Sequence, residues 1–391
     1  MNAIGEQAKK MNDKITAWRR HFHANPELGM ETPKTEAYIV EELKKMGVTN
    51  IRQGIAKHGV AALIEGGKPG KVLGIRGDID ALNMAEDTGL PFASKNGWMH
   101  ACGHDAHAAI LLATAELLMA HRSELKGTVK LIFQPGEEIM SGAGLMIDDG
   151  VLENPKVDAI IGLHTGCVWK DGVPGEVSYR NGAMMAATSF FSITFHGKGG
   201  HGAMPHQTVD PIAIACEAYM ALQTIVSREI NPLDSAVVSI CMFQGGTAEN
   251  IIAPTCTLRG TSRALSQKTH KKIKARIQEI CEHVAKGMRG EVSFEFREGI
   301  PPVVNDREMT DKLRKAAGEI VGGERVREIM EPTMGGEDMA CFMEKVPGTF
   351  FFLPSFASAD SYGHHHPKFD IDESVLWIGS ATFAQFALTW Q

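Results

Sequence analysis

The hydrophobic positions of this 391-residue chain form two kinds of pattern. Nearly uninterrupted apolar runs predict strands that are buried on both faces, as in parallel sheets. They are VLGI (72–75), VKLIF (129–133), DAIIG (158–162) and TFFFL (349–353). Helical periodicity occurs before Pro26, over 33–46 with Pro33 in the first turn, and over 105–121. This alternation predicts an α/β fold with a mainly parallel sheet.

The pattern changes near residue 184 and returns near residue 300. Between these points the order is strand, helix, strand, strand, helix, strand, which is typical of a ferredoxin-like (βαββαβ) unit. The expected strands are 189–196, 235–242, 253–262 and 291–297, and the expected helices are 209–228 and 266–288. Later helices are expected at 306–321, 337–344 and 373–389. We therefore predict one domain from residues 1–183 and 298–391, with a second domain, 184–297, inserted into it.

Composition narrows the class of protein. The chain is 43% hydrophobic and 22% charged, as in ordinary globular proteins. Its net charge of −7 argues against nucleic acid or an anionic membrane as a partner. It contains neither an apolar stretch of membrane-spanning length nor the apolar core of a signal peptide, so we expect a cytoplasmic protein. The seven scattered cysteines do not resemble a disulfide framework.

Residues of the kinds that bind metals are concentrated in four segments, HACGHDAH (100–107), QPGEE (134–138), GLHTG (162–166) and GHHHPKFD (363–370). The carboxyl ends of parallel strands converge at one edge of a sheet, so we expect side chains from these segments to meet there. The candidates are Cys102, His104, Glu138, His164 and one of His364, His365 and His366. A mixed set of sulfur, nitrogen and oxygen ligands suits zinc or a similar divalent ion. The pattern predicts a metal-dependent hydrolase.

Two of these segments also indicate a division of roles. Cys102 precedes a predicted helix, whose positive end favours a thiolate, and a thiolate can bridge two ions. Glu137 and Glu138 are adjacent, so that one can bind a metal while the other takes a proton from water. We expect His107 and the carboxylates of DIDAL (78–82) to orient ligands rather than bind metal, and His100 to be structural.

The inserted domain contributes further candidates. HGKGGHGAMPH (196–206) is a glycine-rich loop without the arrangement of a phosphate-binding loop, and it can present a histidine to an oxyanion. Arg263, with Asn250 beside it, is a candidate for binding a substrate carboxylate.

Together these motifs resemble the dizinc aminoacylase/carboxypeptidase family of metallopeptidases over essentially the whole chain. The similarity is greatest to the branch of hippurate hydrolases, N-acyl-L-amino-acid amidohydrolases and indole-acetyl-amino-acid hydrolases. It rests on RRHFHANPELGMET, RGDIDAL, HACGHDAH, QPGEE, GLH, GKGGHGAMPH, ENIIAP, GTSR, MGGEDMACF and HHPKFD, in family order. The resemblance implies a metal-dependent amidohydrolase that cleaves N-acyl amino acids or small dipeptides with a free carboxylate. It also implies a metal-binding catalytic domain, a lid and dimerisation domain, and a homodimer or tetramer.

The resemblance further implies a role for each matching residue. Cys102 bridges two divalent ions, with zinc favoured over manganese, cobalt or nickel. Glu138 and His365 complete one metal site, and His104 and His164 complete the other. Glu137 is the general base, His201 supports the oxyanion, often across a dimer interface, and Asn250 and Arg263 bind the substrate carboxylate. QPGEEIMSGAG and Asn83 depart from the family pattern without removing a ligand.

Two other functions stay open at this point. One is a cysteine hydrolase, in which Cys102 is the nucleophile and His104 or His107 the base. The other is a non-catalytic protein that binds a metal or ligand on the same fold. Glu137 argues against the second alternative, because a binding protein does not need a base.

Overall fold

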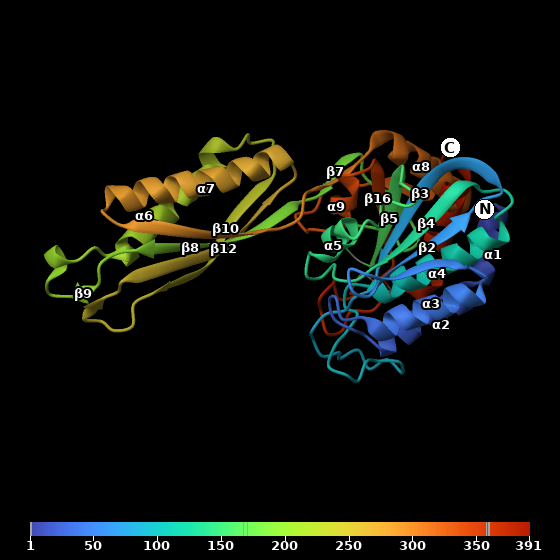
Figure 1. Ribbon diagram of the computed structural model, residues 1–391, viewed down its shortest axis with the longest axis horizontal. Helices are drawn as coiled ribbons and strands as arrows, with labels where there is room; N and C mark the ends of the chain where they lie inside the picture. The colour runs from blue at the N-terminus through green and yellow to red at the C-terminus, as the bar shows by residue number, and fades with distance from the viewer. Residues whose placement is uncertain (1, 167, 170, 357, 359) are drawn as a thin grey trace. The chain divides into compact units, whose positions relative to one another are not determined.

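The computed structural model describes residues 2–391 except 167, 170, 357 and 359. The chain divides into two compact units (Figure 1). The first unit comprises Met1–Gly182, Val304–Glu331 and Asp338–Gln391, and the second comprises Ala183–Val303 and Pro332–Glu337. The sequence placed the corresponding boundaries between 183 and 184 and between 297 and 298.

The first unit is built on an eight-stranded sheet in the order β1-β2-β4-β3-β5-β16-β6-β15. Its centre, β4-β3-β5-β16, is parallel, whereas β1 and β2 pair antiparallel at one edge. The predicted fold with a mainly parallel sheet is therefore confirmed, and the four apolar runs form its parallel centre. The strands are β1 (Asn50–Ile55), β2 (Gly59–Glu65), β3 (Lys68–Asp78), β4 (Lys126–Gln134), β5 (Ala159–Gly166), β6 (Val177–Tyr179), β15 (Val326–Glu328) and β16 (Gly348–Pro354).

Helices surround this sheet. They are α1 (Ala3–Lys10), α2 (Asn12–Ala24), α3 (Pro33–Lys45), α4 (His104–Ala120), α5 (Gly142–Asp148), α8 (Arg307–Val321), α9 (Met339–Met343) and α10 (Leu376–Thr389). The single helix expected before Pro26 is two helices that meet at Met11. Helix α4 contacts β3, α2 and α10 and is apolar on nearly all sides, which matches its burial. No helix among the described residues has the length and apolar character needed to cross a membrane.

The second unit contains a four-stranded antiparallel sheet in the order β10-β12-β8-β13. Its elements are β8 (Ala187–His196), α6 (Pro211–Leu222), β10 (Ala236–Gly245), β12 (Thr255–Ala264), α7 (Gln267–Gly287) and β13 (Glu291–Glu298). Helices α6 and α7 cover one face, where Phe195 and Leu258 join Ile214 and Ile277 in a buried core (Figure 1). The predicted ferredoxin-like unit is confirmed.

A small arm, formed by residues 197–210 and 246–254, extends from one end of this second sheet. In it β9 (Gly200–His201) pairs with β11 (Ile251–Ile252), and His201 lies opposite Ile251. The arm leaves the sheet where His196 of β8 pairs with Thr255 of β12. The chain enters β8 at the opposite end of the sheet, where Ala187 pairs with Ala264.

Candidate metal centre

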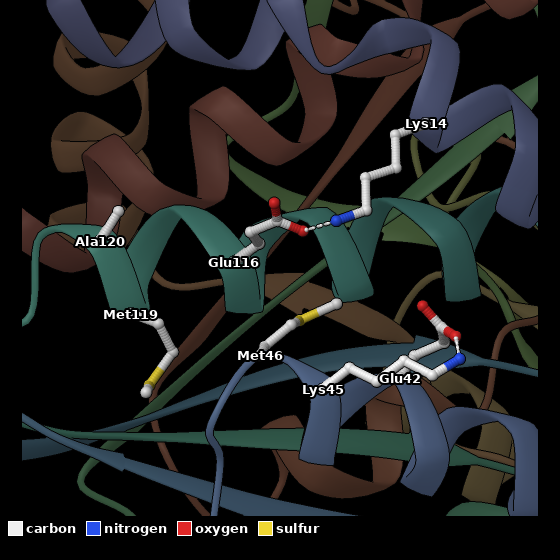
Figure 2. A pocket seen from close by; sticks show the side chains of 7 residues that line it. All are labelled: Lys14, Glu42, Lys45, Met46, Glu116, Met119 and Ala120. Carbon is white, nitrogen blue, oxygen red and sulfur yellow. Dashed lines mark hydrogen bonds and ion pairs between the residues drawn. The ribbon is translucent and has the colours of Figure 1, made fainter.

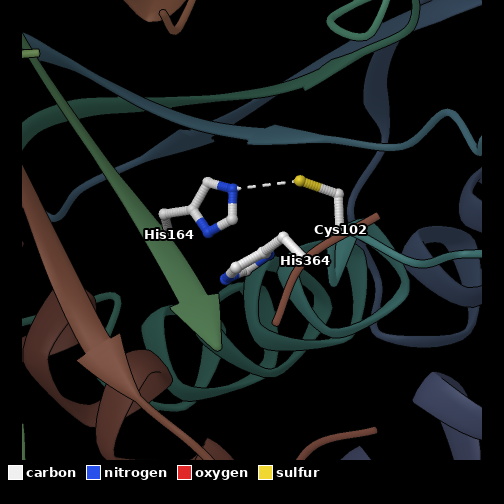
Figure 3. A group of neighbouring side chains, drawn as sticks. All are labelled: Cys102, His164 and His364. Atoms are coloured by element: carbon white, nitrogen blue, oxygen red, sulfur yellow. Dashed lines mark hydrogen bonds between the residues drawn. The ribbon is translucent and has the colours of Figure 1, made fainter. Parts of the chain in front are cut away.

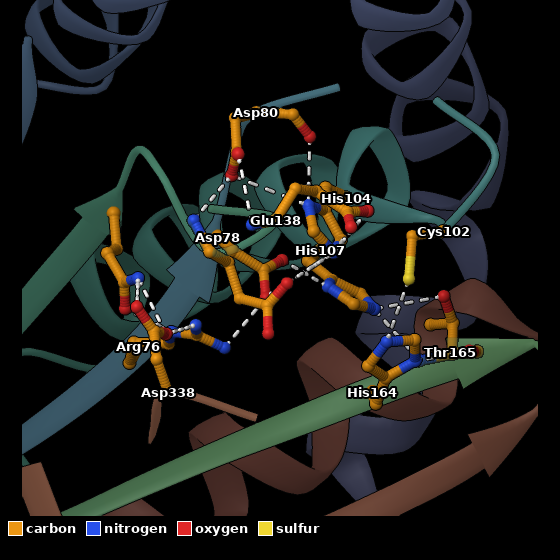
Figure 4. A network of polar contacts seen from close by, with 12 residues as sticks. Arg76, Asp78, Asp80, Cys102, His104, His107, Glu138, His164, Thr165 and Asp338 are labelled. Carbon is orange, nitrogen blue, oxygen red and sulfur yellow. Dashed lines mark hydrogen bonds and ion pairs between the residues drawn. The ribbon is translucent and has the colours of Figure 1, made fainter. Parts of the chain in front are cut away.

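The carboxyl edge of the parallel strands brings the predicted ligand segments together, and Figure 4 shows side chains from three of them, HACGHDAH, QPGEE and GLHTG. Asp78 ends β3, and His164 lies near the end of β5. Helix α4 begins at His104, directly after Gly103, whose backbone has a φ of +93°. A Cβ atom at residue 103 would lie 2.7 Å from Oγ1 of Thr165. A glycine is therefore required for the backbone to pass this close to Thr165.

Cys102 belongs to two groups of potential metal ligands. In each group the ligand atoms all lie within 4.8 Å of one another. The first group contains Cys102, His104 and Glu138, and the second contains Cys102, His164 and His364. The sulfur of Cys102 lies 3.4 Å from Nε2 of His164 (Figure 3). One sulfur shared by two groups is the geometry expected of a bridging ligand.

Two buried acceptor atoms near Cys102 fit a cation. Nδ1 of His104 donates a hydrogen bond to the backbone oxygen of Asp80 at 2.8 Å, which leaves the lone pair on Nε2. In the described part of the chain, neither this Nε2 nor Oε1 of Glu138 makes a hydrogen bond, and the two atoms are 3.9 Å apart. Buried acceptors without a donor are unfavourable. A divalent ion between these atoms would satisfy both, so the residues present fit the expected metal.

Asp80 fixes the two adjacent glutamates. Its Oδ1 accepts the backbone N–H of Glu137 at 3.0 Å, and its Oδ2 accepts the N–H of Glu138 at 3.2 Å. Burial raises the pKa of Glu138 to about 7, and the charges of Asp80 and Asp78 act in the same direction. Oε2 of Glu137 lies 4.0 Å from Nε2 of His104. The structure thus brings both carboxylates to the ligand cluster, as the sequence predicted for QPGEE.

Two of the three consecutive C-terminal histidines approach the cluster. Nε2 of His365 lies 3.5 Å from Oε2 of Glu138, and its backbone N–H donates to the oxygen of Ala101 at 2.8 Å. The ring of His364 is half-buried beside His164, with 5.0 Å between ring centroids. The structure therefore brings His364 to the site in addition to His365, which the resemblance selects. His366 instead stacks on Tyr362.

His107 supports the cluster through both ring nitrogens. Nδ1 lies 2.5 Å from Oδ1 of Asp78, and Nε2 accepts the backbone N–H of Thr165 at 2.8 Å. Neither nitrogen is therefore directed at a metal, in keeping with the orienting role expected for this histidine and for Asp78. Burial alone would raise the pKa of Asp78, but the positive charge of Arg76 and the hydrogen bond from Nδ1 of His107 hold it well below its usual value.

A buried charge network beneath Asp78 was not identified from the sequence. Arg76 donates to Asp78 at 2.7 Å and to Asp338 at 2.8 Å, and all three side chains are buried (Figure 4). Gln134 donates to both carboxylate oxygens of Asp338. The only signal in the sequence is an arginine inside an apolar strand, which requires a buried partner without indicating which residue supplies it.

The remaining candidates lie in the second unit. His201 is exposed on the arm, and its Nδ1 accepts the N–H of Ala203 at 3.0 Å, so that Nε2 carries the proton. Asn250 lies on the same arm, where its backbone oxygen accepts the N–H of Gly202 at 2.8 Å. Arg263 is half-buried on β12, with its guanidinium carbon 5.4 Å from the centroid of Phe190.

Asn250 and Arg263 do not form one site within a chain. Asn250 precedes the Thr255 end of β12, and Arg263 lies eight residues along that strand. At a rise of ~3.3 Å per residue, this places Asn250 and Arg263 more than ~25 Å apart. The expectation that Asn250 lies beside Arg263 is therefore wrong within a chain, because β12 separates the two residues by most of its length.

A hollow on the first unit lies away from the cluster (Figure 2). It is lined by Lys14, Glu42, Lys45, Met46, Glu116, Met119 and Ala120. Ion pairs of Lys14 with Glu116 and of Lys45 with Glu42 neutralise its charges. Glu116 is twelve residues along α4 from His104, or about 18 Å at 1.5 Å per residue, so this hollow is separate from the metal ligands.

Comparisons with known proteins identify the family. The model of peptidase family M20/M25/M40 matches residues 74–389. The chain is 40% identical over 360 residues to N-acetyl-L-cysteine deacetylase of Bacillus subtilis. This match covers 92% of this chain and 83% of the deacetylase. It is also 40% identical over 382 residues to the IAA-amino acid hydrolase ILR1-like 4 of Arabidopsis thaliana, with 96% of this chain and 85% of that protein covered.

A solved structure agrees with this assignment. The Bacillus subtilis YXEP protein, described as a dinuclear metal-binding peptidase of the M20 family, is similar with a TM-score of 0.84 and 34% identity. The match covers 97% of this chain and 98% of that one. The chain belongs to peptidase family M20/M25/M40, and the predicted membership of a family of metal-dependent hydrolases is confirmed.

Proposed function

We propose that this protein hydrolyses the amide bond of N-acyl amino acids, or of small dipeptides, that carry a free carboxylate. In this proposal Cys102 bridges two divalent ions, with zinc favoured, and the remaining ligands are His104, Glu138, His164 and His365. The proposal rests on the observation that the sulfur of Cys102 belongs to two groups of potential metal ligands. Glu137 is adjacent in sequence to Glu138, which is a member of one of these groups. The deacetylase and amino acid hydrolase activities in the names of its relatives support this substrate class.

The side chains divide the reaction between them. When bound, the metal ions supply Lewis acidity, which polarises the amide carbonyl and acidifies water. Glu137 accepts the proton of the attacking water and passes it to the leaving amine. Asp80 holds Glu137 through its backbone N–H, at 3.0 Å. Nε2–H of His201 donates to the developing oxyanion, and the guanidinium of Arg263 binds the substrate carboxylate.

We further propose that two chains assemble and exchange their arms. Strand β10 is an edge of the second sheet, and apolar side chains are exposed on it and on the arm. They are Met204, Met242, Phe243 and Ile251. An exposed apolar edge favours pairing with a second copy. Because His201 and Asn250 share the arm and lie far from Arg263, a partner can supply the first two residues while Arg263 acts in its own chain.

The cysteine-hydrolase alternative has weaker support. Burial and the charge of Glu138 raise the pKa of the Cys102 thiol well above its usual value, which disfavours a free nucleophilic thiolate. Nε2 of His107 is engaged by Thr165 and is not available as a base. Retention of Glu137 beside the cluster disfavours a purely binding protein. A cytoplasmic location stays a prediction.

Removal and return of metal tests the proposal. The enzyme is stripped with a chelator and reloaded separately with zinc, manganese, cobalt or nickel. Each form is assayed on N-acetyl, N-benzoyl and N-indoleacetyl amino acids and on dipeptides. We expect activity to disappear on stripping and to return with two metal equivalents per chain. Full activity in a stripped protein without metal would favour the cysteine hydrolase, whereas metal binding without hydrolysis of any substrate would favour the binding protein.

A further inference from the structure

The N-terminal motif RRHFHANPELG (19–29) has no part in the proposed reaction, yet two of its charged side chains are fully buried. Arg19 is 1% exposed and His23 is 0% exposed. Both lie on α2, four residues apart, and therefore on one face of the helix. Buried charges are unfavourable unless they are paired, so the partners of Arg19 and His23 indicate what this helix does.

Arg19 binds three carboxylates from two distant segments. Its Nε donates to Asp105 at 2.9 Å, its Nη1 to Glu373 at 2.9 Å and its Nη2 to Asp370 at 3.1 Å. Asp105 directly follows His104 in the sequence. Asp370 and Glu373 follow the loop that contains His365. A single guanidinium thus connects the segments that carry two proposed metal ligands.

Asp105 depends on this arrangement. It is 0% exposed, and its Oδ2 also contacts Nδ1 of His23 at 2.7 Å. The other ring nitrogen of His23 lies 3.1 Å from Glu86. Loss of Arg19 would leave Asp105 with one cation instead of two. Removal of one partner from a buried charge network is strongly unfavourable, and here the residue next to His104 would be affected.

We propose that Arg19 is a positioning residue for the metal pair. By holding the start of α4 and the segment after His365 together, it keeps the ligands arranged for metal before the ions bind. This inference rests on the ligand assignment of the proposed function. Residues that orient metal ligands without contacting the metal typically change metal affinity by about 10-fold to 100-fold when they are replaced.

Arg20 provides a matched control within the same helix. It also pairs with Glu373, at 2.6 Å, and its guanidinium carbon lies 4.8 Å from the centroid of Phe92, compared with 5.3 Å for Arg19. However, its side chain is 48% exposed. An exposed ion pair contributes at most about 1 kcal/mol, which corresponds to a change of less than about fivefold.

The test compares Arg19→Met, Arg19→Lys and Arg20→Met with the wild type. Zinc dissociation constants are measured by competition with a chromogenic chelator, and metal equivalents by elemental analysis. We expect Arg19→Met to weaken zinc binding by about 10-fold to 100-fold. Arg19→Lys should restore part of the affinity, and Arg20→Met should change it by less than about fivefold. At saturating zinc, kcat of Arg19→Met should recover, because the ligands themselves are intact.

Wild-type zinc affinity in folded Arg19→Met, or equal losses in Arg19→Met and Arg20→Met, would overturn the inference. If Arg19→Met does not fold, zinc binding is measured for Asp370→Asn instead. This variant removes the charge of one carboxylate that Arg19 contacts, and it should fold because the side chain of Asp370 is 38% exposed. Weaker zinc binding than in Arg20→Met would then support the inference, and unchanged binding would overturn it. A wild-type protein that does not bind two ions would instead contradict the proposed function.

Discussion

The sulfur of Cys102 lies 3.4 Å from Nε2 of His164, across the carboxyl edge of the parallel strands. The same sulfur belongs to the ligand group of His104 and Glu138. This double membership is the reason to expect that Cys102 links the two metal sites.

Replacement of Cys102 tests the bridge and the cysteine-hydrolase alternative together. Cys102→Ala should lose at least one metal equivalent and most of the activity. Cys102→Asp should retain metal and part of the activity, because a carboxylate can also bridge two ions. Metal content and turnover are measured for both variants, with Cys341→Ala as a control. Two metals and normal turnover in Cys102→Ala would refute bridging, and an inactive Cys102→Asp with full metal would favour a nucleophilic cysteine.

Glu137 and Glu138 should be distinguishable by the same pair of measurements. Glu137→Gln preserves shape but cannot accept a proton, so it should bind two metals and lose at least ~10²-fold in kcat. Glu138→Gln should weaken metal binding, since it removes the charge of a ligand. Metal loss in Glu137→Gln combined with full occupancy in Glu138→Gln would show that the two roles are exchanged.

Arg263 should determine the preference for a free carboxylate. A charge-assisted contact contributes roughly 1.5–3 kcal/mol, so esterification or amidation of the substrate carboxylate should reduce kcat/KM more than about tenfold. Arg263→Ala should abolish this difference between free and blocked substrates. Arg259→Ala, which alters an exposed arginine on the same strand, should retain it. A wild-type enzyme that hydrolyses both substrates equally well would remove Arg263 from the site.

Exchange of arms between chains can be tested by mixing two inactive variants. Glu137→Gln lacks the base and His201→Ala lacks the oxyanion donor, so each homodimer should be nearly inactive. In a mixed dimer, the chain that retains Glu137 receives His201 from its partner, which yields one intact site in two. Subunit exchange is verified with tagged chains before the assay. Absence of activity after verified exchange would mean that His201 acts within its own chain or has no catalytic role.

His23 should make stability depend on pH. Burial alone would lower the pKa of His23, but its hydrogen bonds to Asp105 and Glu86 raise it to about 9. Because the pKa is higher in the folded state, this contribution is fully present below about pH 6.5 and is lost as the pH rises to about 9. We expect it to amount to about 3 kcal/mol. The free energy of unfolding of metal-free wild type and His23→Gln should therefore converge over this range. Parallel curves would contradict the assignment.

The sequence contained enough information to predict the main sheet and the inserted unit. Uninterrupted apolar runs are a strong signal for central parallel strands, and ligand residues after such strands converge for a topological reason. The short strands β6 and β15 have only three residues each and gave no such signal. Helix α6 also ends earlier than its apolar periodicity predicts, at Leu222, before a π-helical turn at Ile225–Glu229.

Contacts that depend on tertiary structure were beyond the reach of sequence patterns. The partners Arg76 and Asp338 are 262 residues apart in the chain, and no periodicity connects them. The tautomer of His104 is set by a backbone oxygen, which has no signature in the sequence. The separation of Asn250 from Arg263 became evident only once the register of β12 was known.

Asp80 gives the site one last property. Its two carboxylate oxygens accept the backbone N–H groups of Glu137 and Glu138, so one side chain ties together the backbone of the proposed base and that of the proposed ligand. In the proposed roles, an ion of larger radius that displaces the backbone of Glu138 would also displace that of Glu137, the proposed base. The identity of the metal should therefore alter the rate of proton transfer as well as binding strength, and the ion that binds most tightly need not be the ion that gives the fastest enzyme.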